Sequence, residues 1–189
     1  MLGKFKYVLG VTALALGFFA FGADGKQTVD LSKSSVSAVF KQTGVSSEGE
    51  FRKFSVSVEF DPANVAQTKA RVDIDTASFD IGDPEYNAEL VKKEWFNAAK
   101  YQKASFVSTS VKSLAPGKLE AAGKLTLKGK TVDLNVPVTY RQEGSNVVFE
   151  GSIPIKRLAF NIGEGEWADT SVLENEVRIK FKFTLVSGK

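Results

Sequence analysis

The chain has 189 residues, of which 43% are hydrophobic and 25% are charged, and this is the composition of an ordinary globular protein. It contains no Cys and no His. This excludes disulfides, thiolate nucleophiles, Cys/His zinc sites and histidine general bases. With 25 Lys and Arg against 22 Asp and Glu, the formal charge is only +3, and we expect no binding to nucleic acid. The 15 Phe require a large apolar interior or an apolar ligand.

The start of the chain has the pattern of a secretory signal peptide. Two lysines precede an uncharged apolar run over residues 7–21, and small residues follow at its end. A basic start, an apolar stretch and a small-x-small exit predict cleavage before Ala23. The run is shorter than the roughly 20 residues that a membrane-spanning helix needs. We therefore expect residues 1–22 to be a signal peptide and residues 23–189 to form one domain, which is periplasmic or secreted after cleavage.

Apolar and polar residues alternate from the start of this domain to its end. Such alternation predicts β-strands with one buried and one solvated face, as in antiparallel sheets. Turn motifs such as Pro116-Gly117 and Lys128-Gly129 lie between successive runs, where hairpins need them. The predicted strands cover residues 35–40, 54–60, 69–75, 104–112, 119–127, 132–140, 147–155 and 176–185.

One segment interrupts the alternation. Between Pro84 and Lys93 apolar residues recur at helical spacing, and Asp83 suits the N-cap of a short helix. Two large aromatics, Trp95 and Phe96, follow this helix and are expected to close one end of a barrel. Antiparallel strands with one apolar face each favour closure, because a barrel has no exposed edges. The predicted fold class is all-β, an antiparallel eight-stranded barrel with one short helix, preceded by the signal helix.

A series of short motifs runs in order along nearly the whole domain. It includes the segments 29–36, 49–51, 59–62, 72–78, 80–82, 95–97, 123–129, 157–163 and 167–169. In this combination the chain resembles the YceI family of exported, lipocalin-like, polyisoprenoid-binding proteins. The resemblance implies a barrel that holds a long isoprenoid, such as a polyprenyl phosphate or a quinone tail, for carriage or storage in the periplasm. Family members often carry His at the positions of Lys33 and Lys128, so any role of those imidazoles is absent here.

A bound isoprenoid tail needs a dry apolar channel, in which each buried methylene contributes ~0.8 kcal/mol relative to water. A bilayer is equally apolar, so transient membrane contact for ligand exchange would be part of such a mechanism. The sequence alone favours a filled core, whereas the resemblance favours a cavity. The candidate lining residues are Phe40, Phe54, Val56, Phe106, Phe149, Phe181 and Phe183, with Trp95 and Phe96 at the mouth.

Two alternatives to lipid binding stay open at this point. The first is a secreted structural or protein-interaction module with a filled barrel. The second is an enzyme that uses carboxylates among Glu164, Glu166 and Asp169, although nothing in the sequence positions a substrate there. We expect no catalytic residue, and no cofactor apart from a bound isoprenoid lipid.

A metal site is not predicted either. Asp73, Asp75, Asp80 and Asp83 lie close together in the sequence, but they lack the glycine and the terminal glutamate of a calcium-binding loop. Solvated surface and turn capping are therefore the favoured roles for these aspartates.

Overall fold

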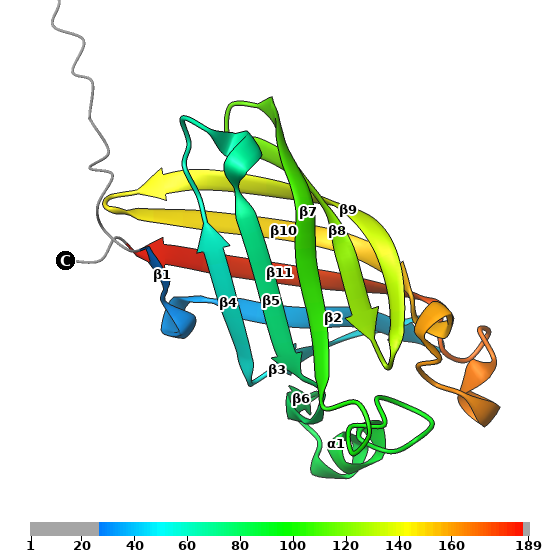
Figure 1. Ribbon diagram of the computed structural model, residues 1–189. Helices are drawn as coiled ribbons and strands as arrows, with labels where there is room; N and C mark the ends of the chain where they lie inside the picture. The colour runs from blue at the N-terminus through cyan, green and yellow to red at the C-terminus, as the bar shows by residue number, and fades with distance from the viewer. Residues whose placement is uncertain (1–26, 187–189) are drawn as a thin grey trace, which may run out of the picture.

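The computed structural model describes residues 27–186, so the predicted signal peptide lies outside the described residues. Within this range no helix is long and apolar enough to cross a membrane. Eleven strands form one antiparallel sheet that curls into a half-barrel (Figure 1). They are β1 (Thr28–Val29), β2 (Ser35–Gln42), β3 (Val45–Phe51), β4 (Phe54–Glu59), β5 (Lys69–Asp75), β6 (Phe79–Asp80), β7 (Lys103–Ala115), β8 (Lys118–Leu127), β9 (Lys130–Glu143), β10 (Asn146–Lys156) and β11 (Glu176–Val186).

The sheet has two layers that share one long strand. The order of strands is β4-β5-β7-β8-β9-β10-β11-β2-β3-β6, and β1 also pairs with β11. In Figure 1, strands β4, β5, β7 and β8 cross in front of β10, β11 and β2. Strand β9 belongs to both layers, because it pairs with β8 over Lys130–Thr139 and with β10 over Val138–Glu143. Over the described residues the path ends at β4 and β6, so the sheet is curled but open.

The structure confirms an all-β antiparallel fold with one short helix, and it adds three strands to the eight predicted. Strands β1 and β6 have only two residues each. Strand β3 is longer, but its inner face carries only Gly49 and Phe51 as buried residues. A strand with a glycine at an inner position shows little apolar alternation, which explains why the pattern does not predict it.

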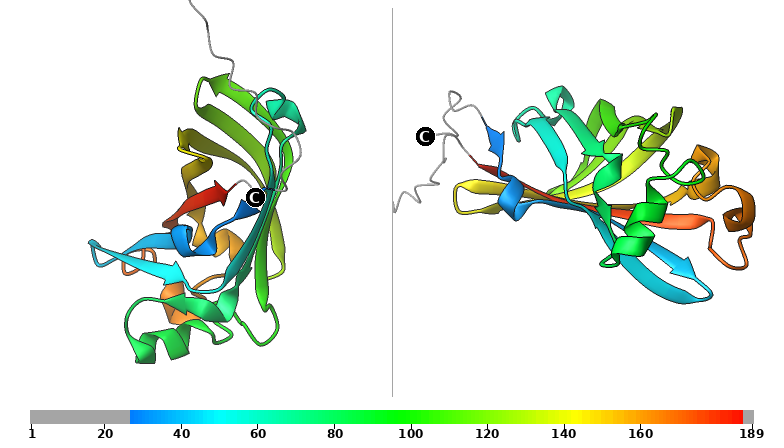
Figure 2. Two further views of the ribbon diagram at one scale, coloured as in Figure 1. Left: turned by 90° about the vertical axis from the view of Figure 1, so that its left-hand side faces the viewer. Right: turned by 90° about the horizontal axis from the view of Figure 1, so that it is seen from below.

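The helix α1 (Pro84–Leu90) begins as predicted and ends three residues earlier than predicted. Oδ1 of Asp83 accepts hydrogen bonds from the backbone N–H of Glu85 at 2.9 Å and of Tyr86 at 3.2 Å. The segment after α1 meets the loop that follows β10, where the N–H of Gly163 donates to the carbonyl of Glu94 at 2.9 Å. Together these segments lie at one end of the half-barrel (Figure 2).

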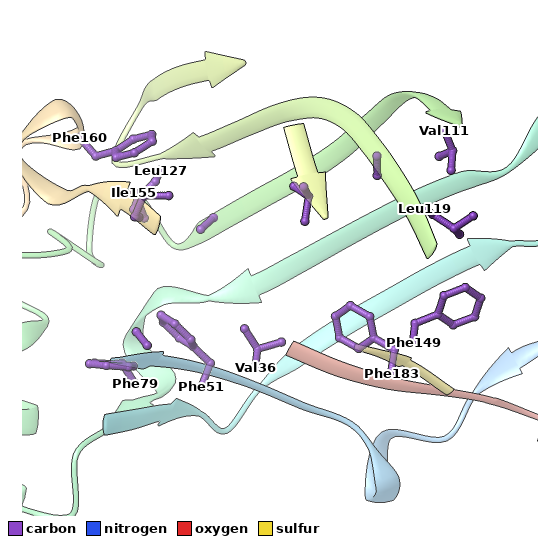
Figure 3. Packing of buried hydrophobic residues seen from close by; sticks show 14 of the residues in the cluster. Val36, Phe51, Phe79, Val111, Leu119, Leu127, Phe149, Ile155, Phe160 and Phe183 are labelled. Carbon is purple, nitrogen blue, oxygen red and sulfur yellow. The ribbon is translucent and has the colours of Figure 1, made fainter. Parts of the chain in front are cut away.

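Aromatic rings fill the interior unevenly. At the end that carries α1, the rings of Phe51 and Phe79 pack with centroids 4.6 Å apart. Phe149 and Phe183 lie together farther along the interior, and Val36 lies between the two pairs (Figure 3). Phe60 packs against Phe149 with centroids 5.0 Å apart. The end away from α1 is therefore filled by rings.

Candidate functional site

An apolar cavity of about 150 Å³ lies inside the half-barrel at the end that carries α1. We call it the outer cavity. Inward side chains of the sheet form its walls, among them Leu127 and Ile155, which lie close together in Figure 3. Tyr86 and Leu90 of α1 cover it from outside the sheet. The helix therefore acts as part of the wall.

Two tryptophans stand beside the outer cavity. Trp95, from the segment after α1, and Trp167, from the loop after β10, pack with ring centroids 5.3 Å apart. Nε1 of Trp95 is buried and has no hydrogen-bond partner among the described residues. Packing against Trp167, rather than a hydrogen bond, therefore orients the Trp95 ring. Tyr86, which is 54% exposed, continues this aromatic rim into solvent.

A second, smaller cavity of about 80 Å³ lies deeper in the half-barrel. We call it the inner cavity. Side chains from both layers line it, including Phe106 of β7, Leu125 of β8, and Phe181 and Phe183 of β11. Ile179 of β11 borders both cavities. The interior is thus hollow near α1 and filled by rings at its other end.

Two charged residues border the outer cavity, Glu89 of α1, which pairs with Nζ of Lys92, and Arg157. Arg157 is only 2% exposed. Its five N–H donors serve backbone carbonyls rather than a carboxylate. They donate to the carbonyls of Ile162 (2.9 Å), Gly163 (3.0 Å), Trp167 (2.7 Å), Leu173 (2.7 Å) and Glu174 (3.0 Å). Burial lowers the pKa of the guanidinium below its ordinary value. Arg157 therefore holds the loop after β10, with Trp167, in place and has no free donor for a ligand.

Comparison with known proteins agrees with this architecture. A family model of the YceI-like domain matches residues 27–185. The chain belongs to the YceI-like family. UPF0312 proteins of Vibrio cholerae are 38% identical to it over 84 residues, which is 44% of this YceI-like chain and 44% of each relative. The match thus spans less than half of those relatives.

Two solved structures show the same curled sheet. BcnA of Burkholderia cenocepacia is 51% identical, and the match covers 82% of this chain and 98% of BcnA with a TM-score of 0.81. A domain from Saccharophagus degradans, described as a polyisoprenoid binding domain implicated in plant cell wall breakdown, is 17% identical. That match covers 86% of this chain and 99% of the domain, with a TM-score of 0.68. The second likeness concerns the fold alone.

The structure distributes the predicted lining residues of this YceI-like chain over three places. Phe40, Trp95 and Phe96 border the outer cavity, and Phe106, Phe181 and Phe183 border the inner cavity. Phe54 and Val56 pack against the core, Phe149 belongs to it, and none of the three borders either cavity.

Aliphatic residues of the cavity walls were not among the candidates. Leu127, Ile155, Val177 and Ile179 border the outer cavity although they carry no ring. Their positions in the alternating runs mark them as inward, so the period-two pattern could have found them. Trp167 lies between the carboxylates Glu166 and Asp169 in the sequence, and only the folded chain brings it to the mouth beside Trp95.

The three carboxylates considered for catalysis lie away from both cavities, and two of them have structural partners. Oε2 of Glu164 accepts from Nζ of Lys128 at 2.9 Å, and the Lys128 side chain is only 6% exposed. Oδ1 of Asp169 accepts from the hydroxyl of Ser171 at 2.7 Å, and this bond lowers the pKa of Asp169. Glu166 is exposed. None of the three borders the outer or inner cavity.

Asp80 connects α1 to the sheet. Its Oδ1 accepts from Nδ2 of Asn87 at 2.8 Å and from the N–H of Gly82 at 2.8 Å, and its Oδ2 accepts from Nε of Arg52 at 3.0 Å. The Asn87 bond, followed by those of Gly82 and Arg52, lowers the pKa of Asp80 to about 2. The carboxylate therefore fixes the helix that covers the outer cavity.

The other aspartates near α1 also have structural partners. Oδ1 of Asp73 pairs with Arg71 at 2.6 Å, Oδ1 of Asp75 accepts from the N–H of Ala77 at 2.9 Å, and Asp83 caps α1. Over residues 27–186, no group of three or more acidic side chains is arranged to hold a metal ion.

Proposed function

We propose that this protein binds one long apolar lipid, a polyisoprenoid or the tail of an isoprenoid quinone, inside the half-barrel for carriage or storage. The observation that supports the proposal is the outer cavity, whose walls are apolar and whose mouth is aromatic. Both charges at this wall have partners within the protein, since Glu89 pairs with Lys92 and the donors of Arg157 are all used by backbone carbonyls. The wall therefore favours hydrocarbon over a polar ligand. The printed description of the Saccharophagus degradans domain supports the same class of ligand.

The energetics favour a carrier that exchanges its ligand with a membrane. Each methylene transferred from water into the cavity contributes ~0.8 kcal/mol. A bilayer offers the same gain, so the protein provides a soluble alternative to the membrane rather than a stronger one. With export by the predicted signal peptide over residues 1–22, the carrier would work in the periplasm or outside the cell, in transient contact with membrane lipid.

We propose further that the protein works without catalysis and without a cofactor other than the bound lipid. Glu164 is engaged by Lys128, and Asp169 caps the turn at Ser171. A structural module with a filled barrel is the second candidate, and the ring-filled end around Phe60 and Phe149 is the observation in its favour. The outer cavity argues against it.

Extraction of native protein tests the proposal. The mature chain is purified from cells without detergent, extracted with organic solvent, and the extract is analysed by mass spectrometry. Val177→Phe places a ring in the outer cavity, and Val45→Phe, at a side chain 64% exposed on β3, is the matched control. We expect near-stoichiometric isoprenoid lipid from the wild type and from Val45→Phe, and less from Val177→Phe. Absence of any long-chain lipid from all three proteins would contradict the proposal.

A further inference from the structure

The boundary between the two cavities runs through one side chain of β11. Val177 borders the outer cavity, Ile179 borders both cavities, and Phe181 borders the inner cavity. These residues alternate along the inward face of one strand, so their order along the chain is also their order along the interior.

Strand β8, in the layer that faces β11, places the boundary between the two cavities at the same level. On β8, Leu127 borders the outer cavity and Leu125, two residues earlier, borders the inner cavity. The cross-strand partners of Ile179 also lie on either side of it, since Ala38 of β2 borders the outer cavity and Ile153 of β10 borders the inner cavity. Ile179 therefore separates two spaces that lie in line.

The volumes show why this boundary matters for a chain-like ligand. A cavity of about 150 Å³ is the size that holds a guest such as benzene. An isoprenoid of several units is longer than such a guest and must continue into the inner cavity of about 80 Å³. To do so, it has to displace the side chain of Ile179. The methyl group of Ala38 next to it leaves room on the side of the outer cavity.

We propose that Ile179 is the specificity-determining residue that sets how far an apolar chain reaches into the half-barrel, and hence which chain lengths the protein prefers. This inference rests on the proposed function. A smaller residue at position 179 joins the cavities and favours long chains. A larger residue at this position closes the inner cavity, so that a long chain no longer binds more tightly than a short one.

Titration with prenyl alcohols of two, three and four isoprene units (geraniol, farnesol and geranylgeraniol) tests the inference. Trp95 and Trp167 are the two tryptophans of the sequence, and both border the outer cavity, so intrinsic fluorescence reports on its occupation. The measured quantity is the ratio of the affinities for the longest and the shortest alcohol. Each additional buried methylene raises affinity about fourfold. The variants are Ile179→Ala and Ile179→Phe, and Val177→Ala is the control because it enlarges the outer cavity without touching the boundary.

We expect the ratio to rise about tenfold in Ile179→Ala, to approach one in Ile179→Phe, and to stay within about twofold of the wild type in Val177→Ala. If Ile179→Ala does not fold, Ile179→Val is expected to raise the ratio about fourfold. An unchanged ratio in the position-179 variants, with the wild type binding all three alcohols, would overturn this inference and leave the proposed function standing. Absence of binding by the wild type to any alcohol would overturn both.

Discussion

The ring of Phe79 occupies the space that a side chain at Gly49 would need. A Cβ on Gly49 would lie 2.5 Å from Cζ of Phe79 and 2.7 Å from Cγ2 of Ile81, and all of its close neighbours are side-chain atoms. Phe79 and Ile81 also border the outer cavity. The glycine thus leaves room for an aromatic ring against β3, at the wall of the cavity.

A double-mutant cycle measures this relationship. Gly49→Ala should lower the free energy of unfolding by about 1–3 kcal/mol, because an added methyl group overpacks the site and pushes Phe79 toward the cavity. In the background of Phe79→Leu, the same alanine should cost less, with only the contact to Cγ2 of Ile81 left to relax. Urea denaturation of the wild type, the two single variants and the double variant gives the coupling free energy between positions 49 and 79. Equal costs in the two backgrounds would show that the ring is not the reason for the glycine.

Arg157 should be essential for the loop that forms one side of the mouth. Arg157→Met keeps the apolar stem but leaves buried carbonyls without donors, and we expect it to lower the free energy of unfolding by at least about 3 kcal/mol. The emission of Trp167 should shift as the loop loosens. Arg178→Met is the control, because its guanidinium pairs with Glu176 at the surface, with a side chain 48% exposed, and should cost no more than about 1 kcal/mol. Similar small losses in both variants would contradict the structural role of Arg157.

The pH dependence of stability should report on Asp80. Its pKa is lowered from 3.8 to about 2, first of all by the hydrogen bond from Asn87, so the fold favours the ionised carboxylate. Its contribution to stability is complete above the unfolded value of 3.8 and is lost as the pH falls through about 2. The difference in urea midpoint between the wild type and Asp80→Asn should therefore be constant from neutral pH to about pH 4 and shrink toward pH 2.

Asp133→Asn is the control for that measurement. Its carboxylate pairs with Lys124 at the surface and is 80% exposed, so the change should have little effect at any pH. A difference for Asp80→Asn that stays undiminished down to pH 2 would mean that its charge does not contribute.

In the loop after β10, stability should respond to loss of the Glu164 carboxylate and tolerate loss of the Glu166 carboxylate. Glu164→Gln removes the charge that compensates the buried ammonium of Lys128 and should cost about 1 kcal/mol. Glu166→Gln, at an exposed side chain, should stay within about 0.5 kcal/mol of the wild type. Thermal melts of the two variants decide this, and equal effects would argue against the Lys128–Glu164 pair as a structural contact.

Period-two alternation was sufficient to predict most of the fold. The runs that became β4, β9 and β11 are each apolar on one face and polar on the other, and in the structure the predicted apolar residues are less exposed than most of their polar neighbours. Asp83 predicted the start of α1 because its N-cap chemistry is local. Strand β3 could not be predicted in this way, because the side chain that covers Gly49 comes from Phe79, far along the chain.

The cavities depend on the spacing between the two layers of the sheet, which the period-two pattern of apolar residues does not encode. Phe106 and Phe149 both face inward, yet the first borders a cavity and the second packs against Phe60. Which ring fills the interior and which leaves space is decided by the crossing of two layers joined through β9. The role of Arg157 was hidden for a similar reason, since its partners are backbone carbonyls of a loop rather than residues with a sequence signature.

Photo-crosslinking tests the central claim most directly, because it locates the chain inside the molecule. A prenyl chain of four isoprene units with a diazirine at its tail is bound to the protein and irradiated, and the labelled peptides are identified by mass spectrometry. We predict labels on β7 and β11 at residues that border the inner cavity, such as Phe106 and Phe181, and competition by unlabelled geranylgeraniol. Labels confined to the outer surface, or no specific label, would contradict a chain held within the half-barrel.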